Sequence, residues 1–288
     1  MTNPMIVGLI AHVGKDGSAN LVQSVTTELE RRNAPYLLEK ATAGLIGKES
    51  DLDEALLSER CDLLLVMGGD GSILRALHRS GGHICPIFGI NIGSLGFLTC
   101  LGSAEYLKAI DCVLAGDYVL SPRSLLDVAI EGPNGTVPQE RALNDVTISR
   151  GERSQLVKLE ASVDGAPLTE YHADGLIVAT PTGSTAYSLA AGGPILMPES
   201  GALVITPICP HVLSNRSLVI SDKSRVVIRC SGNQEVFVTI DGRPPNALKP
   251  SEQVILQLSP LTLPLAMMPD SNFPEILRQK LKWSGSNI

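Results

Sequence analysis

The stretch that most constrains the fold runs from Asp62 to Ser72 and reads Asp-Leu-Leu-Leu-Val-Met-Gly-Gly-Asp-Gly-Ser. Its apolar part, Leu63 to Met67, is short and bounded, which predicts a strand buried on both faces of a sheet. Ile73 to His78 then predicts the start of a helix, with Ser72 as its N-cap. A strand, a glycine turn and a helix N-terminus together form an anion-binding site, because close backbone N–H groups and the helix dipole both favour negative charge.

Asp70 is the unusual member of this turn. A carboxylate repels a phosphate unless it has a task of its own, such as receiving a proton or holding Mg²⁺. A tight turn with Asp as a simple turn former would be the preferred explanation of a lone Gly-Asp-Gly. The rest of the chain must therefore decide between these interpretations.

Composition and charge limit the classes of protein that the chain can be. Its 288 residues are 44% hydrophobic and 18% charged, which predicts a globular protein of one large domain or two ordinary ones. The net charge of −7 argues against nucleic acid or an anionic membrane as a partner, because no overall positive field attracts either. An anionic small ligand is still allowed, held locally by backbone amides and a few basic residues.

Two further features predict a cytoplasmic protein. The six cysteines show no C-x-x-C pair and no metal-ligand spacing, so we expect buried, reduced thiols. We assign no residue to a metal site. The N-terminus lacks a basic segment followed by a long apolar one, and no run is long enough to span a bilayer.

The first part of the chain alternates between strand and helix patterns, which predicts a parallel sheet and a Rossmann-like α/β domain over residues 1–118. In such sheets ligands bind at the carboxyl ends of the strands, where Asp70 and the turn at Gly93 are expected. In the helix predicted over 51–59, Leu52, Leu56 and Leu57 should face inward. The expected strands are 5–12, 35–38, 63–67 and 85–90, and the expected helices are 19–32, 51–59 and 104–114.

The rhythm changes near residue 120, where short strand patterns follow one another with hairpin signals between them. Asn134-Gly135, Asp164-Gly165 and Asp241-Gly242 are such signals. We predict a β-rich, sandwich-like domain over residues 119–263. The expected strands are 125–130, 157–163, 176–179, 203–206, 225–229, 236–240 and 254–258.

The tail from Asn272 to Trp283 predicts one amphipathic helix. Phe273, Ile276, Leu277 and Leu281 should share its apolar face. Trp283, the only Trp, is expected to be a packing anchor.

Several phosphotransferases share the Gly-Gly-Asp-Gly turn, among them NAD kinases, diacylglycerol and sphingosine kinases, and phosphofructokinases. The segment Asp174-Gly-Leu-Ile-Val-Ala-Thr-Pro-Thr-Gly-Ser-Thr-Ala-Tyr187 decides between them, because it resembles the long signature of the NAD kinases. Gly89–Phe97, Leu143–Asp145 and Thr206–Arg216 are weaker matches to the same family. The resemblance extends over nearly the whole chain, tail included.

This resemblance implies the family's fold, an α/β domain followed by a β-rich domain, with the final helix (within 264–288) packing back on the first. It also implies phosphorylation of the 2′-hydroxyl of the adenosine ribose of NAD, giving NADP. ATP would be the donor, with a divalent cation such as Mg²⁺, and the chain would form homodimers or homotetramers. Neither a nucleic acid nor a membrane partner is expected.

Asp70 is our candidate catalytic residue, facing the 2′-hydroxyl as a proton acceptor, and Gly71 allows close backbone approach beside it. A positioned acceptor suffices because the proton can leave late in a loose transition state. A role for Asp70 as a Mg²⁺ ligand is left open. The resemblance assigns Asn144 and Asp145 to NAD binding. The family often has Glu at the latter position, and a carboxylate beside a diol can accept both hydroxyl hydrogens.

The remaining candidates for NAD binding also rest on the resemblance, against the simpler explanation of helix capping and hairpin turns. The basic residue that the family has before the Asp174 loop is His172 here, and the family often has Gln where Arg243 stands. Gln155 matches by spacing alone. Lys15 and Arg75 are candidates for ATP phosphates, although solvated surface positions would explain them equally well. The full set of these NAD candidates is Gln155, His172, Asp174, Thr185, Ala186, Tyr187, Ser188, Leu189, Ala190 and Arg243.

Two other functions fit parts of the sequence. A lipid kinase of the diacylglycerol type shares the turn and the two-domain plan but does not explain the Thr180–Tyr187 segment. A Rossmann-type nucleotide-binding regulator without catalysis would not explain a carboxylate inside an anion-binding turn.

Overall fold

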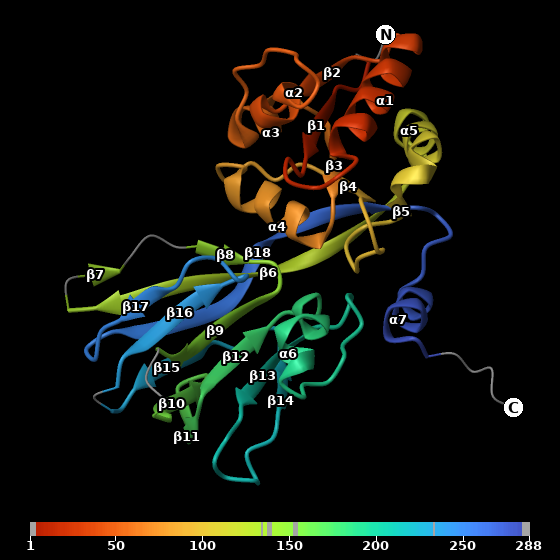
Figure 1. Cartoon of the computed structure of the whole chain (residues 1–288). Coiled ribbons are helices and arrows are strands. Elements are labelled where there is room, and N and C mark those ends of the chain that lie inside the picture. Colours follow the sequence, from red (N-terminus) through yellow and green to blue (C-terminus); the bar gives the residue numbers. More distant parts are fainter. Residues whose placement is uncertain (1–3, 134, 137–139, 152–154, 233, 284–288) are drawn as a thin grey trace, which may run out of the picture. The chain divides into compact units, whose positions relative to one another are not determined.

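The computed structural model describes residues 4–133, 135–136, 140–151, 155–232 and 234–283 (Figure 1). The chain forms two compact units, one of Met1–Pro122 with Leu263–Ile288 and one of Arg123–Thr262. Two long strands, β6 (Val119–Gly132) and β18 (Gln253–Met267), contribute residues to both units. No helix among the described residues is both long and apolar enough to cross a membrane.

The first unit is built on a parallel sheet, as its apolar strand patterns predict. The central strand β3 is buried along its whole length, and Leu65 pairs with Leu9 on one side and Phe88 on the other. The end of β18 extends the sheet, since Leu265 pairs in parallel with Ile87. In spatial order the strands before β18 are β2 (Tyr36–Leu38), β1 (Val7–Ala11), β3 (Leu63–Gly68) and β4 (Ile87–Asn91), and the short β5 (Leu101–Gly102) also pairs with β4.

Helices cover both faces of this sheet (Figure 1). On one face, α1 (Ser18–Arg31) and α5 (Tyr106–Ala115) bury their apolar sides against β1, β3 and β4. On the other, α4 (Asp70–Arg79) packs so closely that a Cβ added at Gly89 would lie 2.9 Å from Ile73 Cδ1. The remaining helices of this unit are α2 (Lys40–Gly44), α3 (Glu54–Arg60), the 3-10 turn η1 (Ser103–Glu105) and α7 (Phe273–Leu281).

The predicted α/β fold with a strand-rich second part is confirmed, but several local predictions are wrong. The helix after the glycine turn begins at Asp70 with Gly69 as N-cap, because the Ser72 N–H bonds the Gly69 carbonyl inside the first turn. Leu56 is 38% exposed rather than inward, and α2 was not predicted. Trp283 is 54% exposed and therefore no packing anchor. The expectation that the cysteines are buried is wrong for Cys209, which is exposed. None of the six cysteines forms a disulfide.

The second unit contains two strand layers whose inner faces form one core. Every second residue of β9, β12 and β16 points into this core, and so do alternate residues of β10, β15 and β18. This period of two is what the sequence pattern predicts for sheets with one buried face. The Asp164-Gly165 hairpin joins β10 and β11 as predicted, whereas Asn134 lies outside the described residues.

One layer is antiparallel, in the order β14 (Leu218–Ser221), β13 (Ala202–Ile208), β12 (Gly175–Ala179), β9 (Asp145–Arg150), β16 (Val236–Ile240) and β17 (Asn246–Leu248). The other contains β11 (Ala166–Ala173), β10 (Val157–Val163), β15 (Val226–Cys230) and β18, with β6 and the short β7 (Gly135–Thr136) and β8 (Glu140–Ala142) beside it. The turn η2 (Gly183–Thr185) and α6 (Tyr187–Ala190) follow β12.

Candidate functional site

Asp70 is held at the carboxyl end of β3 by the backbone of a neighbouring loop. Its carboxylate accepts hydrogen bonds from the N–H groups of Phe97 (2.8 Å) and Leu98 (3.0 Å). A Cβ added at Gly96 would overlap the Asp70 carboxylate, so this loop can approach only because residue 96 is glycine. The two amides fix the orientation of the carboxylate, and each oxygen keeps a lone pair for a further partner.

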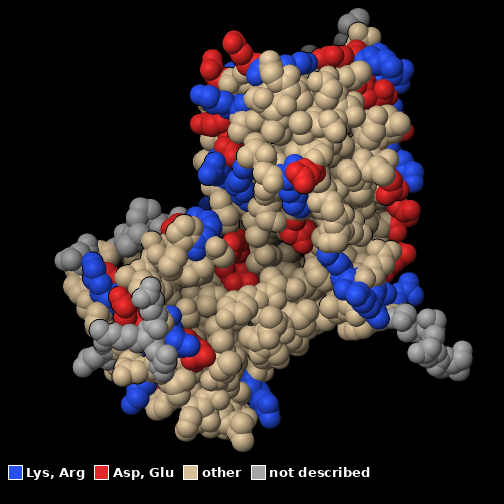
Figure 2. Space-filling view, viewed as in Figure 1, with Lys and Arg blue, Asp and Glu red and all other residues tan. Residues whose placement is uncertain are grey.

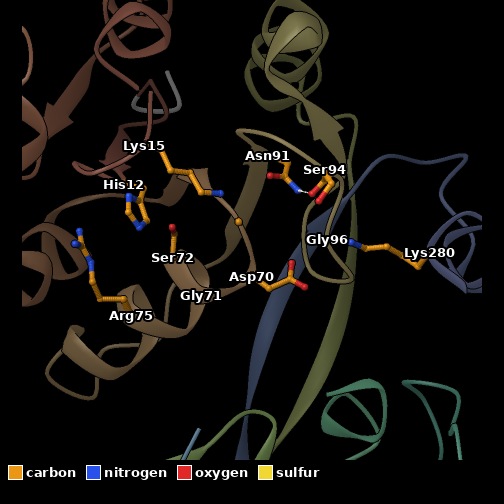
Figure 3. Close-up of a pocket in the computed structure, with 11 residues that line it drawn as sticks. His12, Lys15, Asp70, Gly71, Ser72, Arg75, Asn91, Ser94, Gly96 and Lys280 are labelled. Atoms are coloured by element: carbon orange, nitrogen blue, oxygen red, sulfur yellow. Dashed lines mark hydrogen bonds between the residues drawn. The ribbon is translucent and has the colours of Figure 1, made fainter. Parts of the chain in front are cut away.

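A cavity of about 490 Å³ opens beside Asp70 (Figure 3). The N-terminus of α4 faces it through Gly69, Asp70 and Gly71, and no side chain among the described residues caps this helix end. The cavity therefore joins a helix dipole, exposed backbone N–H groups and several cations, which suits a phosphate chain. Its lining residues are His12, Lys15, Gly69, Asp70, Gly71, Ser72, Arg75, Asn91, Ser94, Gly96 and Lys280.

Two of the lining cations, Lys15 and Arg75, already contact the protein. Lys15 Nζ donates to the carbonyl of Ile92 (2.9 Å) and approaches that of Gly68 (3.4 Å), and Arg75 Nε lies 3.5 Å from Glu54 Oε1. These contacts place both cations around the glycine turn. Of the two sequence interpretations for Lys15 and Arg75, the cavity position favours the one that assigns them to phosphates.

In the second unit, Asn144 and Asp145 lie where β9 begins, and Asp241 organises them. The Asp241 carboxylate accepts from the N–H groups of Leu143 (2.7 Å), Asn144 (2.8 Å) and Asp145 (3.0 Å). Asp145 itself is 94% buried, with a side chain that accepts from Thr147 Oγ1 (3.4 Å) and from the backbone of Tyr187. Burial, together with the nearby negative charge of Asp241, raises the pKa of Asp145 to about 7.

The segment from Thr185 to Ala190 lies beside this pair of residues. Gly183 packs directly on the Asn144 backbone, where a Cβ would overlap the carbonyl. Tyr187 is 47% exposed and can meet a ligand, whereas the Ser188 hydroxyl is buried and bonded to Thr206 Oγ1 at 2.9 Å. The structure thus groups six sequence candidates, Thr185–Ala190, with Asn144 and Asp145, and Ser188 is fully buried within this group.

Three other candidates of the second unit, Gln155, His172 and Asp174, do not join this group. Ala179 pairs with Asp145 at one end of β12, while Asp174 precedes the other end, roughly 16 Å away at about 3.3 Å per residue. There Asp174 accepts from Arg150 Nε (2.7 Å), and His172 Nε2 lies 2.5 Å from Glu170. Gln155 is exposed before β10. Arg243 is the exception: it lies in the turn that Asp241 begins beside Asp145, and it pairs with Glu140.

Sequence reasoning missed three groups with a role in these sites. The Phe97 and Leu98 amides gave no signal, because any residue type carries an N–H. Asp241 looked like an ordinary hairpin residue, although its φ of +48° is unusual for a residue other than glycine. Lys280 received no role in the sequence prediction. It follows Phe273 by seven residues, or about two helical turns, and this spacing puts both side chains on the packing side of the tail helix.

The described residues contain no group of three His, Cys, Asp or Glu side chains that could hold a metal ion. Asp70 is the carboxylate that lines the cavity of the first unit. A hard cation such as Mg²⁺ usually binds one or two carboxylates together with substrate phosphates and water. The donor set fits a cation that enters with a phosphate ligand.

Comparisons with known proteins agree along the whole chain. Residues 7–118 match the family model of the ATP-NAD kinase N-terminal domain, and residues 143–267 match that of the ATP-NAD kinase C-terminal domain. A curated NAD kinase from Symbiobacterium thermophilum is 40% identical over 275 residues, or 95% of this chain and 97% of that protein. One from Geobacter metallireducens is 38% identical over 96% of this chain and 98% of its own length.

Solved structures give the same result. The structure of yeast NADH kinase complexed with NADH matches with a TM-score of 0.90 and 25% identity, covering 100% of this chain and 90% of that one. An NAD kinase from Archaeoglobus fulgidus, solved in complex with ATP, matches with a TM-score of 0.73 and 23% identity, covering 98% and 100%, which supports the fold.

Replacing Asp145 by Asn should flatten the pH dependence of stability. The unfolded carboxyl ionises near its ordinary pKa of 3.8, whereas the folded one keeps its proton up to about pH 7. Folding therefore takes up a proton in this window, and the free energy of unfolding of the unaltered protein falls as pH rises through it. Urea denaturation at about pH 5 and about pH 8 should show a smaller difference for the variant. An equally steep dependence in both proteins would contradict the buried, high-pKa carboxyl.

Proposed function

The chain belongs to the NAD kinase family, and we propose that it transfers the γ-phosphoryl group of ATP to the 2′-hydroxyl of the adenosine ribose of NAD, giving NADP. The observation that carries this proposal is the Asp70 carboxylate, fixed by two backbone amides at the edge of a cavity suited to phosphates. A carboxylate in such a place opposes phosphate binding unless it also takes part in the reaction.

In the proposed reaction the ribose 2′-oxygen attacks the γ-phosphorus while the bond from that phosphorus to the bridging oxygen of ADP breaks. The hydroxyl proton passes to Asp70, and ADP leaves. Phosphoryl transfer depends mainly on alignment and charge neutralisation, so the residues need only position the partners and compensate charge. The Phe97 and Leu98 amides keep the Asp70 carboxylate aimed, and the N-terminus of α4 faces the phosphates.

NAD recognition is proposed for the candidates that the sequence indicated. Asp145 in its ionised form can accept both hydroxyl hydrogens of a ribose, and Tyr187 offers an exposed ring or hydroxyl. The backbone of Thr185–Ala190 would contact the adenine edge. Gln155, His172, Asp174 and Arg243 are proposed as further NAD contacts on the strength of the family resemblance. The first three lie apart from Asp145 within this chain, whereas Arg243 lies in the turn that Asp241 begins beside Asp145.

We also propose that a divalent cation, Mg²⁺, binds with ATP. The phosphates of ATP would hold it, with Asp70 as a protein ligand in the alternative to its role as proton acceptor, and when bound it would neutralise charge on the phosphate oxygens. We propose the cytoplasm as the site of action, where cysteines that form no disulfide, as all six here, are the rule.

The function is tested by incubating the purified protein with NAD, ATP and Mg²⁺ and measuring NADP with an NADP-specific dehydrogenase. Asp70→Asn should lower turnover by about 100-fold or more, because the amide keeps the shape but loses the proton acceptor and the charge. Circular dichroism should show an unchanged fold. Full activity of the Asn variant would rule out Asp70 as the acceptor. Failure to form NADP from NAD, or NADPH from NADH, with either ATP or polyphosphate would end the proposal.

Glycine at position 96 should be required for activity but not for folding. An added methyl group in Gly96→Ala would displace the Asp70 carboxylate, so we expect turnover to fall by about 10- to 100-fold. Gly102→Ala is the matched control, since its Cβ would meet nothing within 4 Å. Equal activity of the two variants would show that the position of Asp70 is not critical.

The family resemblance also leads us to propose a homodimer or homotetramer. The strand β11 ends its sheet and exposes five consecutive residues, Ala166–Glu170, so its edge is open to pairing. Light scattering coupled to gel filtration should give two or four times the chain mass of 30.5 kDa. A monomer at all concentrations would contradict this.

A further inference from the structure

Lys280 occupies an unexpected place on the tail helix α7. Phe273, Ile276 and Leu277 form the packing side of this helix, and the latter two are buried. Lys280 follows them by seven, four and three residues, so the helical period puts its side chain on the same side. A cation on the packing side of an amphipathic helix is costly unless it has a partner.

The structure directs Lys280 into the cavity of Asp70 (Figure 3). Phe273 anchors the helix on Phe97, with ring centroids 6.4 Å apart, and Lys280 Nζ lies 5.8 Å from the same Phe97 ring. Phe97 is also the residue whose N–H donates to Asp70. The tail helix thus brings a positive charge to the loop that aims the catalytic carboxylate.

The charge of Lys280 is available to a ligand. Lys15 is bonded to carbonyl oxygens and Arg75 lies against Glu54, as described above. Among the described residues, no carboxylate forms an ion pair with Lys280, and its ammonium group contacts the face of the Phe97 ring. Figure 2 shows Lys and Arg gathered on the surface where α7 lies, and α7 with its C-cap contributes Arg278, Lys280 and Lys282 to it.

We propose that Lys280 is a catalytic residue that binds the γ-phosphoryl group of ATP during its transfer. This proposal rests on the proposed NAD kinase activity. As the bond from the γ-phosphorus to the bridging oxygen of ADP breaks and the bond to the ribose oxygen forms, the ammonium group donates hydrogen bonds to a non-bridging oxygen of the γ-phosphoryl group. The proton of the ribose hydroxyl goes to Asp70, so Lys280 keeps its own protons throughout.

The alternative is a purely structural role, in which the ammonium only holds the Phe97 loop through its contact with the ring. Two substitutions of Lys280 distinguish these roles, because one keeps the packing and the other keeps the charge. Methionine keeps an unbranched chain that packs on an aromatic ring but has no charge, whereas arginine keeps the charge and also stacks on rings. Lys280→Met therefore separates packing from charge.

The test measures steady-state NADP formation with varied ATP and varied NAD for Lys280→Met, Lys280→Arg and the unaltered protein. We expect Lys280→Met to lower kcat by about 100-fold with the KM for NAD changed less than about twofold. Lys280→Arg should keep at least about a tenth of the activity. In Lys280→Ala, which leaves space at this position, added ethylammonium should restore part of the activity, which a packing defect would not allow. Arg278→Met, which removes an exposed charge from the same helix, is the matched control and should leave the rate unchanged.

Binding gives a readout that does not depend on turnover. Titration calorimetry with MgATP should show binding to Lys280→Met that is about tenfold weaker than to the unaltered protein, and unchanged binding to Arg278→Met. Lys280→Met with unaltered kcat and unaltered ATP affinity would overturn the proposal, and so would a loss that neither arginine nor ethylammonium repairs. An unaltered protein that forms no NADP contradicts the proposed function instead, and calorimetry then still decides whether Lys280 binds the donor.

Discussion

Two hydrogen bonds from the Phe97 and Leu98 amides to the Asp70 carboxylate are the interaction on which the candidate site depends. They would resolve the conflict of charge in the proposed reaction, in which a carboxylate and a phosphate chain share one cavity. The amides bind the carboxylate from the loop side, while the N-terminus of α4 and the cations face the space for a ligand. The close approach of loop and turn needs glycine at two positions. A Cβ at position 68 would overlap Ser72, and a Cβ at position 96 would overlap Asp70.

The second unit uses the same physical device for another purpose. The Asp241 carboxylate accepts three consecutive amides and thereby shapes the loop of Asn144 and Asp145. Burial raises the pKa of Asp145, and the negative charge of Asp241 raises it further, so Asp241 both positions its neighbour and shifts its pKa. Asp145 and the Tyr187 segment then form one group, because β9 and β12 are paired and Gly183 lets the following turn rest on Asn144.

Four of the five Asp-Gly pairs in the chain show why sequence reasoning stops where it does. Asp164-Gly165 is a hairpin whose carboxylate caps the Arg225 amide, and Asp174 pairs with Arg150. Asp241 organises a loop, and Asp70 begins a helix beside a cavity. The local sequence is the same in all four, so the dipeptide predicts a turn but not its role. Ser72 illustrates the same limit: it looked like an N-cap, yet it lies inside the helix because the turn closes two residues earlier.

The sequence by itself determined the layers and the family. Unbroken apolar runs dictate strands buried on both faces, alternating runs dictate strands with one buried face, and the long Asp174–Tyr187 segment is specific enough to indicate an NAD kinase. Only the tertiary structure decided which backbone amides hold Asp70, that Asp145 is buried beside Asp241, and that Lys280 reaches a cavity 210 residues away in the chain. The reason is physical: periodicity reports how much of each face is buried, whereas orientation and charge in a site depend on groups that only folding brings together.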